Sequence, residues 1–275
     1  IRVSNEEQFQ ELDLEKLDRL YIGFYNNLDK IIPMVKAKNK EVYLWTDKIL
    51  YPKDLEKLMD IIKPIEHLLD GISVSNIGTL NFVKDNFDMD IHGDIGLNVF
   101  NSFTAKLLKE HNVNTVSLSP ELNIGQIEEL CNNNYNSYEA IGYGYLPLMV
   151  MEYCPMSIIK NCKDDLNCND CPFSKGYGLR DRMNMDFYME RKNGTTTIYN
   201  SVPLMVLDSI DKIYNNHVDT IRLDFTFEKK GIREIQSIYY DYAKGIATED
   251  ERDKFIKEYR NKNKITRGHY FRGVI

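Results

Sequence analysis

Short runs of apolar residues, rich in β-branched and aromatic side chains, recur along the chain. They predict eight strands, at residues 20–25, 42–46, 71–76, 91–100, 115–119, 138–150, 196–200 and 220–225. Most runs are almost continuously apolar rather than alternating between apolar and polar residues. This pattern is typical of strands that are buried on both faces.

Helical patterns separate most of these strands. Apolar side chains recur at helical spacing in residues 55–62, 124–131, 204–213 and 232–239. The third segment follows Pro203, a residue well suited to a first helical turn. Strands that alternate with helices indicate βα units and a parallel sheet. Eight such units in 275 residues predict one α/β domain over residues 1–275, folded as a closed (β/α)₈ barrel, with an open doubly wound sheet as the alternative.

Residues 151–195 interrupt this rhythm directly after the sixth predicted strand. Four of the five cysteines lie in this interval, at Cys154, Cys162, Cys168 and Cys171. Long insertions after a strand are where a barrel carries functional loops. We therefore expect a Cys-rich, metal-binding insertion here. The fifth cysteine, Cys131, lies on the apolar stripe of a predicted helix, which indicates a buried small side chain.

The spacing of the four clustered cysteines suits a metal centre. Seven, five and two residues separate them in turn, and the last pair forms a C-x-x-C. Four thiolates without a nearby histidine suit either a tetrahedral zinc or a [4Fe–4S] cluster. Pro155 and Pro172 each follow a cysteine, which favours iron–sulfur. The alternatives are four unrelated thiols, or a redox pair with two bystanders.

Two cations, Arg180 and Arg182, follow the cysteines in the segment GYGLRDR. Guanidinium groups near an iron–sulfur centre offset its negative charge, so we predict that these two residues contact the cofactor. A solvated charged turn is the alternative.

Composition and charge limit the partners and the compartment that we expect for this protein. The net charge of −7 argues against a purely electrostatic nucleic-acid binder. The longest apolar stretches are too short to span a bilayer, and the first residues show no signal pattern, so we expect a cytoplasmic protein with reduced thiols. The chain lacks an initiator Met, so we expect a fragment of a longer protein.

Several segments together carry a family resemblance. Residues 94–126, the cysteine insertion, residues 176–182, residues 198–208 and residues 266–274 resemble, in the same order, the collagenase-like peptidases of unassigned catalytic type, family U-thirty-two. The resemblance covers most of the chain from about residue 70 onward. It implies the C-terminal part of the family's barrel domain.

The resemblance implies more than a fold. Family members are named as proteases, but characterised relatives hydroxylate transfer or ribosomal RNA bases, or ubiquinone without oxygen. In these relatives four cysteines hold a [4Fe–4S] cluster, and the matching positions are Cys154, Cys162, Cys168 and Cys171. In the RNA-modifying relatives prephenate supplies the hydroxyl group.

Polar residues near the ends of the predicted strands are candidates for the catalytic site, because barrels carry their chemistry there. Asn98 and Glu121 lie in runs shared with the family, and we predict that they line the pocket. Arg222 and Asp224 alternate along one strand face. Inside a barrel they should pair with other charged groups, because an isolated buried charge is costly. His92 is expected to be a hydrogen-bonded core residue.

Three functions remain open. The chain has no G-x-S-x-G elbow and no H-E-x-x-H pair, and its five histidines show no metal spacing. We therefore favour an iron–sulfur enzyme that hydroxylates an RNA base, acting on RNA or a small molecule through its full-length parent. A peptidase acting on peptides and a structural zinc module are the alternatives. The oligomeric state is not predicted.

Overall fold

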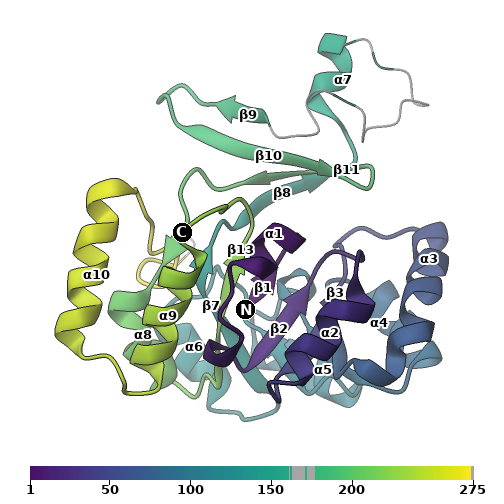
Figure 1. The fold of residues 1–275 in the computed structure, drawn as a ribbon, viewed down its shortest axis with the longest axis horizontal. Helices are drawn as coiled ribbons and strands as arrows, with labels where there is room; N and C mark the ends of the chain where they lie inside the picture. Colours follow the sequence, from purple (N-terminus) through teal and green to yellow (C-terminus); the bar gives the residue numbers. More distant parts are fainter. Residues whose placement is uncertain (161, 163–170, 172–176, 274–275) are drawn as a thin grey trace. The chain divides into compact units, whose positions relative to one another are not determined.

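The computed structural model describes residues 1–160, 162, 171 and 177–273 (Figure 1). By their internal contacts these residues form two compact units. The first consists of Ile1–Gly144 and Leu204–Ile275, and the second of Tyr145–Pro203.

The first unit is a closed barrel of eight parallel strands. They are β1 (Arg2–Val3), β2 (Arg19–Ile22), β3 (Glu41–Trp45), β4 (Gly71–Val74), β5 (Asp90–Gly93), β6 (Thr115–Ser117), β7 (Ser137–Gly144) and β13 (Thr220–Phe225). Strands β1 to β7 pair in chain order from β1 to β2 through β6 to β7, and β13 pairs with both β7 and β1 and closes the ring. The predicted (β/α)₈ barrel is confirmed.

Helices connect the strands. They are α1 (Glu6–Gln10), α2 (Leu28–Lys36), α3 (Pro52–Ile62), α4 (Ile77–Asn86), α5 (Ser102–Glu110), α6 (Ile124–Cys131), α8 (Ile210–Tyr214), α9 (Ile232–Ala243) and α10 (Glu249–Lys262), with 3₁₀ turns η1 (Leu14–Lys16), η2 (Lys63–Leu68), η3 (Ile95–Leu97) and η5 (Leu207–Ser209). Asparagines begin three consecutive helices: the side chains of Asn76, Asn101 and Asn123 each accept a hydrogen bond from a backbone N–H in the first turn. None of the helices in the described ranges is long and apolar enough to cross a membrane.

The alternation of side chains along each strand divides the interior of the barrel from the helix layer. In β2, Leu20 and Ile22 point one way and Tyr21 the other, and all three are buried. The Tyr21 ring lies 5.2 Å from the ring of His92 on β5, although β2 pairs only with β1 and β3. Tyr21 must therefore reach His92 through the interior, which leaves Leu20 and Ile22 facing the helices.

The second unit is a four-stranded antiparallel sheet. Its strands are β8 (Pro147–Met151), β9 (Tyr177–Arg180), β10 (Asp186–Lys192) and β11 (Thr195–Tyr199), in the order β8-β11-β10-β9, and α7 (Pro155–Lys160) follows β8. Asn193 and Gly194 join β10 to β11, and both have positive φ angles, 50° and 77°. An Asn-Gly pair is the preferred two-residue connection of such a hairpin.

Three details of the sequence prediction are wrong. The strand predicted at 196–200 belongs to the second unit, and its place in the barrel is taken by β1, which was not predicted. The single run 138–150 divides into β7 and β8. The helix predicted at 204–213 begins instead as β12 (Leu204–Met205), a short strand antiparallel to β7, and becomes helical only from Leu207.

The insertion follows the sixth strand of our prediction, which is the seventh strand of the barrel because β1 precedes it. Its compact unit spans Tyr145–Pro203, a wider interval than the predicted 151–195.

Candidate functional site

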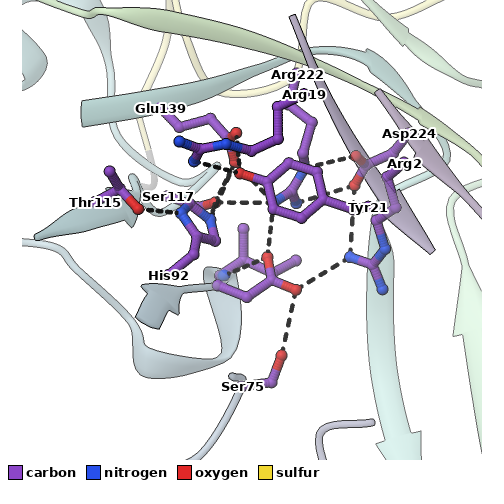
Figure 2. Close-up of polar contacts among 12 residues, drawn as sticks. Arg2, Arg19, Tyr21, Ser75, His92, Thr115, Ser117, Glu139, Arg222 and Asp224 are labelled. Carbon is purple, nitrogen blue, oxygen red and sulfur yellow. Dashed lines mark hydrogen bonds and ion pairs between the residues drawn. The ribbon is translucent and has the colours of Figure 1, made fainter. Parts of the chain in front are cut away.

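A cluster of charged side chains fills the interior of the barrel, with Arg222 at its centre (Figure 2). Arg222 is only 1% exposed and projects from β13. Its Nε and Nη2 donate to the two carboxylate oxygens of Asp224 over 2.6 and 3.0 Å. Its Nη1 lies 2.8 Å from Glu139 Oε1 and 3.0 Å from Asp94 Oδ1. One guanidinium thus binds three carboxylates, from β13, β7 and the end of β5.

This arrangement holds the buried carboxylates in their charged form. Burial raises the pKa of Asp94, but the guanidiniums of Arg222 and Arg2 outweigh it and leave that pKa well below its usual range. Burial likewise raises the pKa of Glu139, and Arg222 and His92 lower it by more. Both carboxyl groups are therefore ionised at neutral pH. The expectation that Arg222 and Asp224 pair with other charged groups is confirmed.

Glu139 is also bound by hydroxyl groups. Tyr21 donates its phenolic proton to Oε2 over 2.8 Å, and Ser117 donates to Oε1 over 2.7 Å. Both donors lie on other strands, β2 and β6, so the carboxylate joins three strands through the interior. A charge this deeply buried is tolerated because its lone pairs are occupied.

His92 is a hydrogen-bonded core residue, as expected, and has no exposed surface. Its Nδ1 lies 2.9 Å from Thr115 Oγ1, and its Nε2 lies 3.0 Å from Ser117 Oγ. Because the Ser117 proton is already given to Glu139, Nε2 must be the donor toward Ser117. His92 therefore cannot take a proton from Ser117, and neither residue is reachable by a substrate. This Ser–His–Glu group is not a hydrolytic triad.

Arg2 extends the cluster toward the carboxyl ends of the strands. Its Nη1 lies 3.2 Å from Asp94 Oδ2 and 3.6 Å from Asp224 Oδ2, and its guanidinium stacks 3.9 Å from the centre of the Trp45 ring. Ser75 donates to the same oxygen of Asp94 over 3.3 Å. The Arg2 side chain is 19% exposed, more than those of Asp94 and Asp224. Arg2 thus marks the end of the cluster nearest to solvent.

The other two predicted catalytic residues do not join this cluster. Asn98 is exposed and ends the η3 turn with a left-handed backbone, φ 51°. Glu121 is also exposed, and only its backbone N–H has a described hydrogen bond, 3.4 Å from Ser119 Oγ. Both follow barrel strands, β5 and β6, so they lie at the end of the barrel where such folds place their chemistry. Their catalytic role stays a prediction.

The predicted metal ligands lie in the second unit. Cys154, Cys162 and Cys171 are each partly exposed, whereas Cys168 lies outside the described residues. Among the described part of the chain, no three His, Cys, Asp or Glu side chains are placed to hold a metal ion. Convergence of the four thiols on one centre therefore stays a prediction.

The two predicted cofactor cations are exposed. Arg180 forms a two-bond ion pair with Asp186 across β9 and β10, at 2.6 and 2.8 Å. Arg182 lies in the turn between these strands. Their contact with a cofactor stays a prediction.

Sequence reasoning missed three members of the barrel cluster, Arg2, Asp94 and Glu139. Glu139 left a usable signal, because it is a lone charged residue inside the apolar run YEAIG, where burial without a partner is too costly. Arg2 and Asp94 left no such signal, because Arg2 lies in a two-residue strand and Asp94 lies just past the end of β5.

Fold and interior together define a (β/α)₈ barrel with an ionic core and an inserted, cysteine-bearing sheet. The family model of Peptidase family U32 matches residues 22–273. The chain therefore belongs to peptidase family U32, and the resemblance inferred from its motifs is confirmed.

The similarity to an individual protein is weaker than the match to the family and covers less of the chain. The chain is 30% identical over 139 residues to the "Uncharacterized protease MJ0090" of Methanocaldococcus jannaschii, a match that covers 48% of this chain and 33% of that relative. The match thus spans about a third of the curated relative's length.

Two solved structures are similar at 9% identity. "The Structure of the U32 Peptidase Mk0906" aligns with a TM-score of 0.49 over 82% of this chain and 92% of that one. A family GH18 chitinase from Cycas revoluta, in complex with allosamidin, aligns with a TM-score of 0.42 over 86% and 95%. Neither likeness carries a conclusion about the reaction of this chain.

Proposed function

We propose that this chain is the barrel and cysteine unit of an iron–sulfur enzyme of peptidase family U32, and that the full-length parent hydroxylates an RNA base. The observation that carries the proposal is a contrast in accessibility. Within the described barrel, the only groups that resemble a hydrolytic constellation, Ser117, His92 and Glu139, are buried and bound to one another. The thiols of Cys154 and Cys162 are partly exposed.

The donor chemistry fits an iron–sulfur centre. Cys154 and Cys162 are free thiols, and thiolates are the usual ligands of such clusters. A buried N–H nearby, Nε of Arg191, has no hydrogen-bond partner among the described residues, as expected beside a site built for an anionic group. When bound, the cluster supplies one-electron chemistry that side chains lack.

The barrel's own residues supply a rigid frame in this proposal. The contacts of the Arg222 cluster join six strands, β1, β2, β5, β6, β7 and β13. The strand ends that precede Asn98 and Glu121, and the strand that bears Arg2, are thereby held in fixed positions. A base must leave its stack to react, and it then needs a preformed pocket. We place that pocket at the strand ends.

Peptide hydrolysis is the second candidate, and the comparisons favour it by name. Both the family and the curated relative are named for proteolysis. A peptidase with this structure would have to use groups other than Ser117 and His92. A metal held by cysteine thiols, with one position left for water, would be one such group.

One experiment separates the two activities. The gene for the full-length parent is deleted, and nucleosides from transfer and ribosomal RNA are compared by mass spectrometry with those of the wild type. The strain is then complemented with wild type, Cys154→Ala, or the exposed control Tyr188→Phe. In parallel, the anaerobically purified parent is tested for peptide cleavage.

Loss of one hydroxylated nucleoside, restored by wild type and by Tyr188→Phe but not by Cys154→Ala, is the expected result. Unchanged RNA together with peptide cleavage that Cys154→Ala abolishes would establish the peptidase instead. Colourless protein with one stoichiometric zinc, and neither activity, would leave a structural zinc module.

A further inference from the structure

One face of the four-stranded sheet carries both Tyr177, which contacts Cys154, and Arg191. In an antiparallel sheet, directly paired residues and residues two apart on one strand share a face. Tyr177 pairs with Met189, and Arg191, two residues further, pairs with Thr196. These four side chains therefore lie on the same face. Met189 and Thr196 are buried, so this face is covered.

Cys154 reaches this face through Tyr177. Its Sγ lies 3.8 Å from the phenolic oxygen of Tyr177, within hydrogen-bond range for sulfur. A tyrosine hydroxyl keeps its proton at neutral pH and donates readily to a thiolate. Ser157 fixes the other side of Cys154, because its hydroxyl donates to the Cys154 carbonyl over 2.7 Å. Both contacts of Cys154 are thus made within the second unit.

Arg191 lies beside the same stretch of chain. Its Nη1 donates to the carbonyl of Glu152, two residues before Cys154, and to Thr196 Oγ1, both over 2.8 Å. Its Nε is buried and has no partner among the described residues. Leaving a buried donor unsatisfied costs roughly 1–3 kcal/mol, which favours an acceptor at this point. A cation with an unused N–H is therefore bound to the chain two residues before Cys154.

Arg180 offers a matched contrast. It lies three residues after Tyr177 on β9 and therefore projects from the opposite face of the sheet. There it is exposed and paired with Asp186. Of the two arginines, only Arg191 shares a face with Tyr177.

We propose that Tyr177 and Arg191 are positioning residues for an anionic metal–thiolate centre at Cys154. The Tyr177 hydroxyl donates to the Cys154 sulfur, and Arg191 supplies positive charge and its buried N–H to the same surroundings. Hydrogen bonds and cations around ligating sulfurs stabilise the more negative, reduced state and retain the metal. The inference rests on the proposed function only in requiring that Cys154 binds a metal.

The test uses the whole chain, loaded anaerobically with iron and sulfide, and in a second preparation with zinc. Wild type is compared with Tyr177→Phe, Arg191→Met, Arg191→Lys and the control Tyr188→Phe, which changes an exposed tyrosine on the other face of the sheet. The readouts are the rate of metal loss to an excess of chelator and, for the iron form, the midpoint reduction potential. Circular dichroism of each metal-free variant checks that the sheet is intact.

Tyr177→Phe and Arg191→Met are expected to lose metal about tenfold faster than wild type and to lower the midpoint potential. Arg191→Lys retains the charge and should recover part of the loss, while Tyr188→Phe should match wild type. A purely structural role would change folding without moving the potential of the folded variants.

Release rates and potentials equal to wild type in both Tyr177→Phe and Arg191→Met would overturn the inference. Wild type that takes up neither an iron–sulfur centre nor zinc would overturn it together with the metal in the proposed function. A loaded wild type with the expected variant effects, but without any RNA hydroxylation by the parent, would reject the proposed reaction and leave the inference standing.

Discussion

The barrel interior and the cysteine-bearing sheet use polar side chains in opposite ways. In the barrel, Arg222, Glu139 and Asp94 are buried and bind one another. In the second unit, Cys154 and Cys162 are partly exposed, and Arg180 is paired only at the surface. Charges that are buried and paired hold strands in place, but they are not free to meet a substrate. The most conspicuous cluster of ionisable groups in the described barrel is thus the one that holds its strands together.

The largest expected difference between the two regions is in thiol reactivity. In metal-free, reduced protein, iodoacetamide should modify Cys131 at least about a hundredfold more slowly than Cys154 or Cys162. Cys131 has no exposed surface, and burial raises its pKa to about 12, so almost no thiolate is present. Time-resolved labelling with peptide mass spectrometry measures the rates. Equal alkylation rates at Cys131 and Cys154 would contradict the expected difference between the two regions.

Removal of the central cation should have the next largest effect. Arg222→Met removes the cation that three buried carboxylates share, which should cost about 3–5 kcal/mol of the free energy of unfolding. Urea unfolding measures it. Arg180→Met removes an arginine from an exposed pair and should cause no measurable change. A loss below about 1 kcal/mol for Arg222→Met would show that the cluster is not the frame.

Acid should weaken the barrel through the same groups. The pKa of Asp94 and that of Glu139 are held below their ordinary values in the folded chain, so the unfolded chain binds more protons as the pH falls through about 4. Their stabilisation is present above about pH 4 and is lost below it. Burial raises the pKa of Glu228, whose contribution has the opposite sign and is lost as pH rises.

We expect the free energy of unfolding to fall by at least about 1 kcal/mol between pH 5 and pH 3. The dependence should be shallower in Asp94→Asn, which cannot titrate at that position. Urea titrations at several pH values measure both slopes. Parallel curves for the two proteins would assign the acid sensitivity to other groups.

The smallest expected effect concerns a single hydroxyl. Tyr239 donates to the carbonyl of Gly142 over 2.7 Å and accepts from the N–H of Val206 over 3.2 Å. Tyr239→Phe should therefore cost about 1–2 kcal/mol, because two buried backbone groups lose a partner. Thermal unfolding measures the change. A variant as stable as wild type would mean that this contact between α9 and β7 contributes little.

Most of the fold was predictable from the sequence because the periodicity of apolar residues is a local property. Apolar runs and helical stripes identify seven of the eight barrel strands and three helices from neighbouring residues alone. Strand β1 was missed because a strand of two residues is too short to show a pattern of apolar positions. The strand at Thr195–Tyr199 was assigned to the wrong sheet, because the pattern of a strand does not say which partner it pairs with.

The candidate site was predictable only in part, for the same reason. Arg222 and Asp224 were identified as buried charges that need charged partners, because they alternate along one strand face. Their partners Glu139 and Asp94 are distant in sequence, and only the closure of the barrel brings them together. The contacts of Arg191 with Glu152 and Thr196 likewise depend on the register of three strands, which no local pattern determines.

The insertion also affects how the chain is made. Strand β13 pairs with both β7 and β1, and it is translated only after the whole of Tyr145–Pro203. At roughly 5–20 residues per second, a ribosome spends several seconds on that interval. During this time the nascent sheet from β1 to β7 has two unpaired edges, which are sites for wrong pairing with other chains. The inserted sheet therefore delays closure of the barrel. The slow step of biogenesis should be the addition of β13, the last barrel strand to be translated.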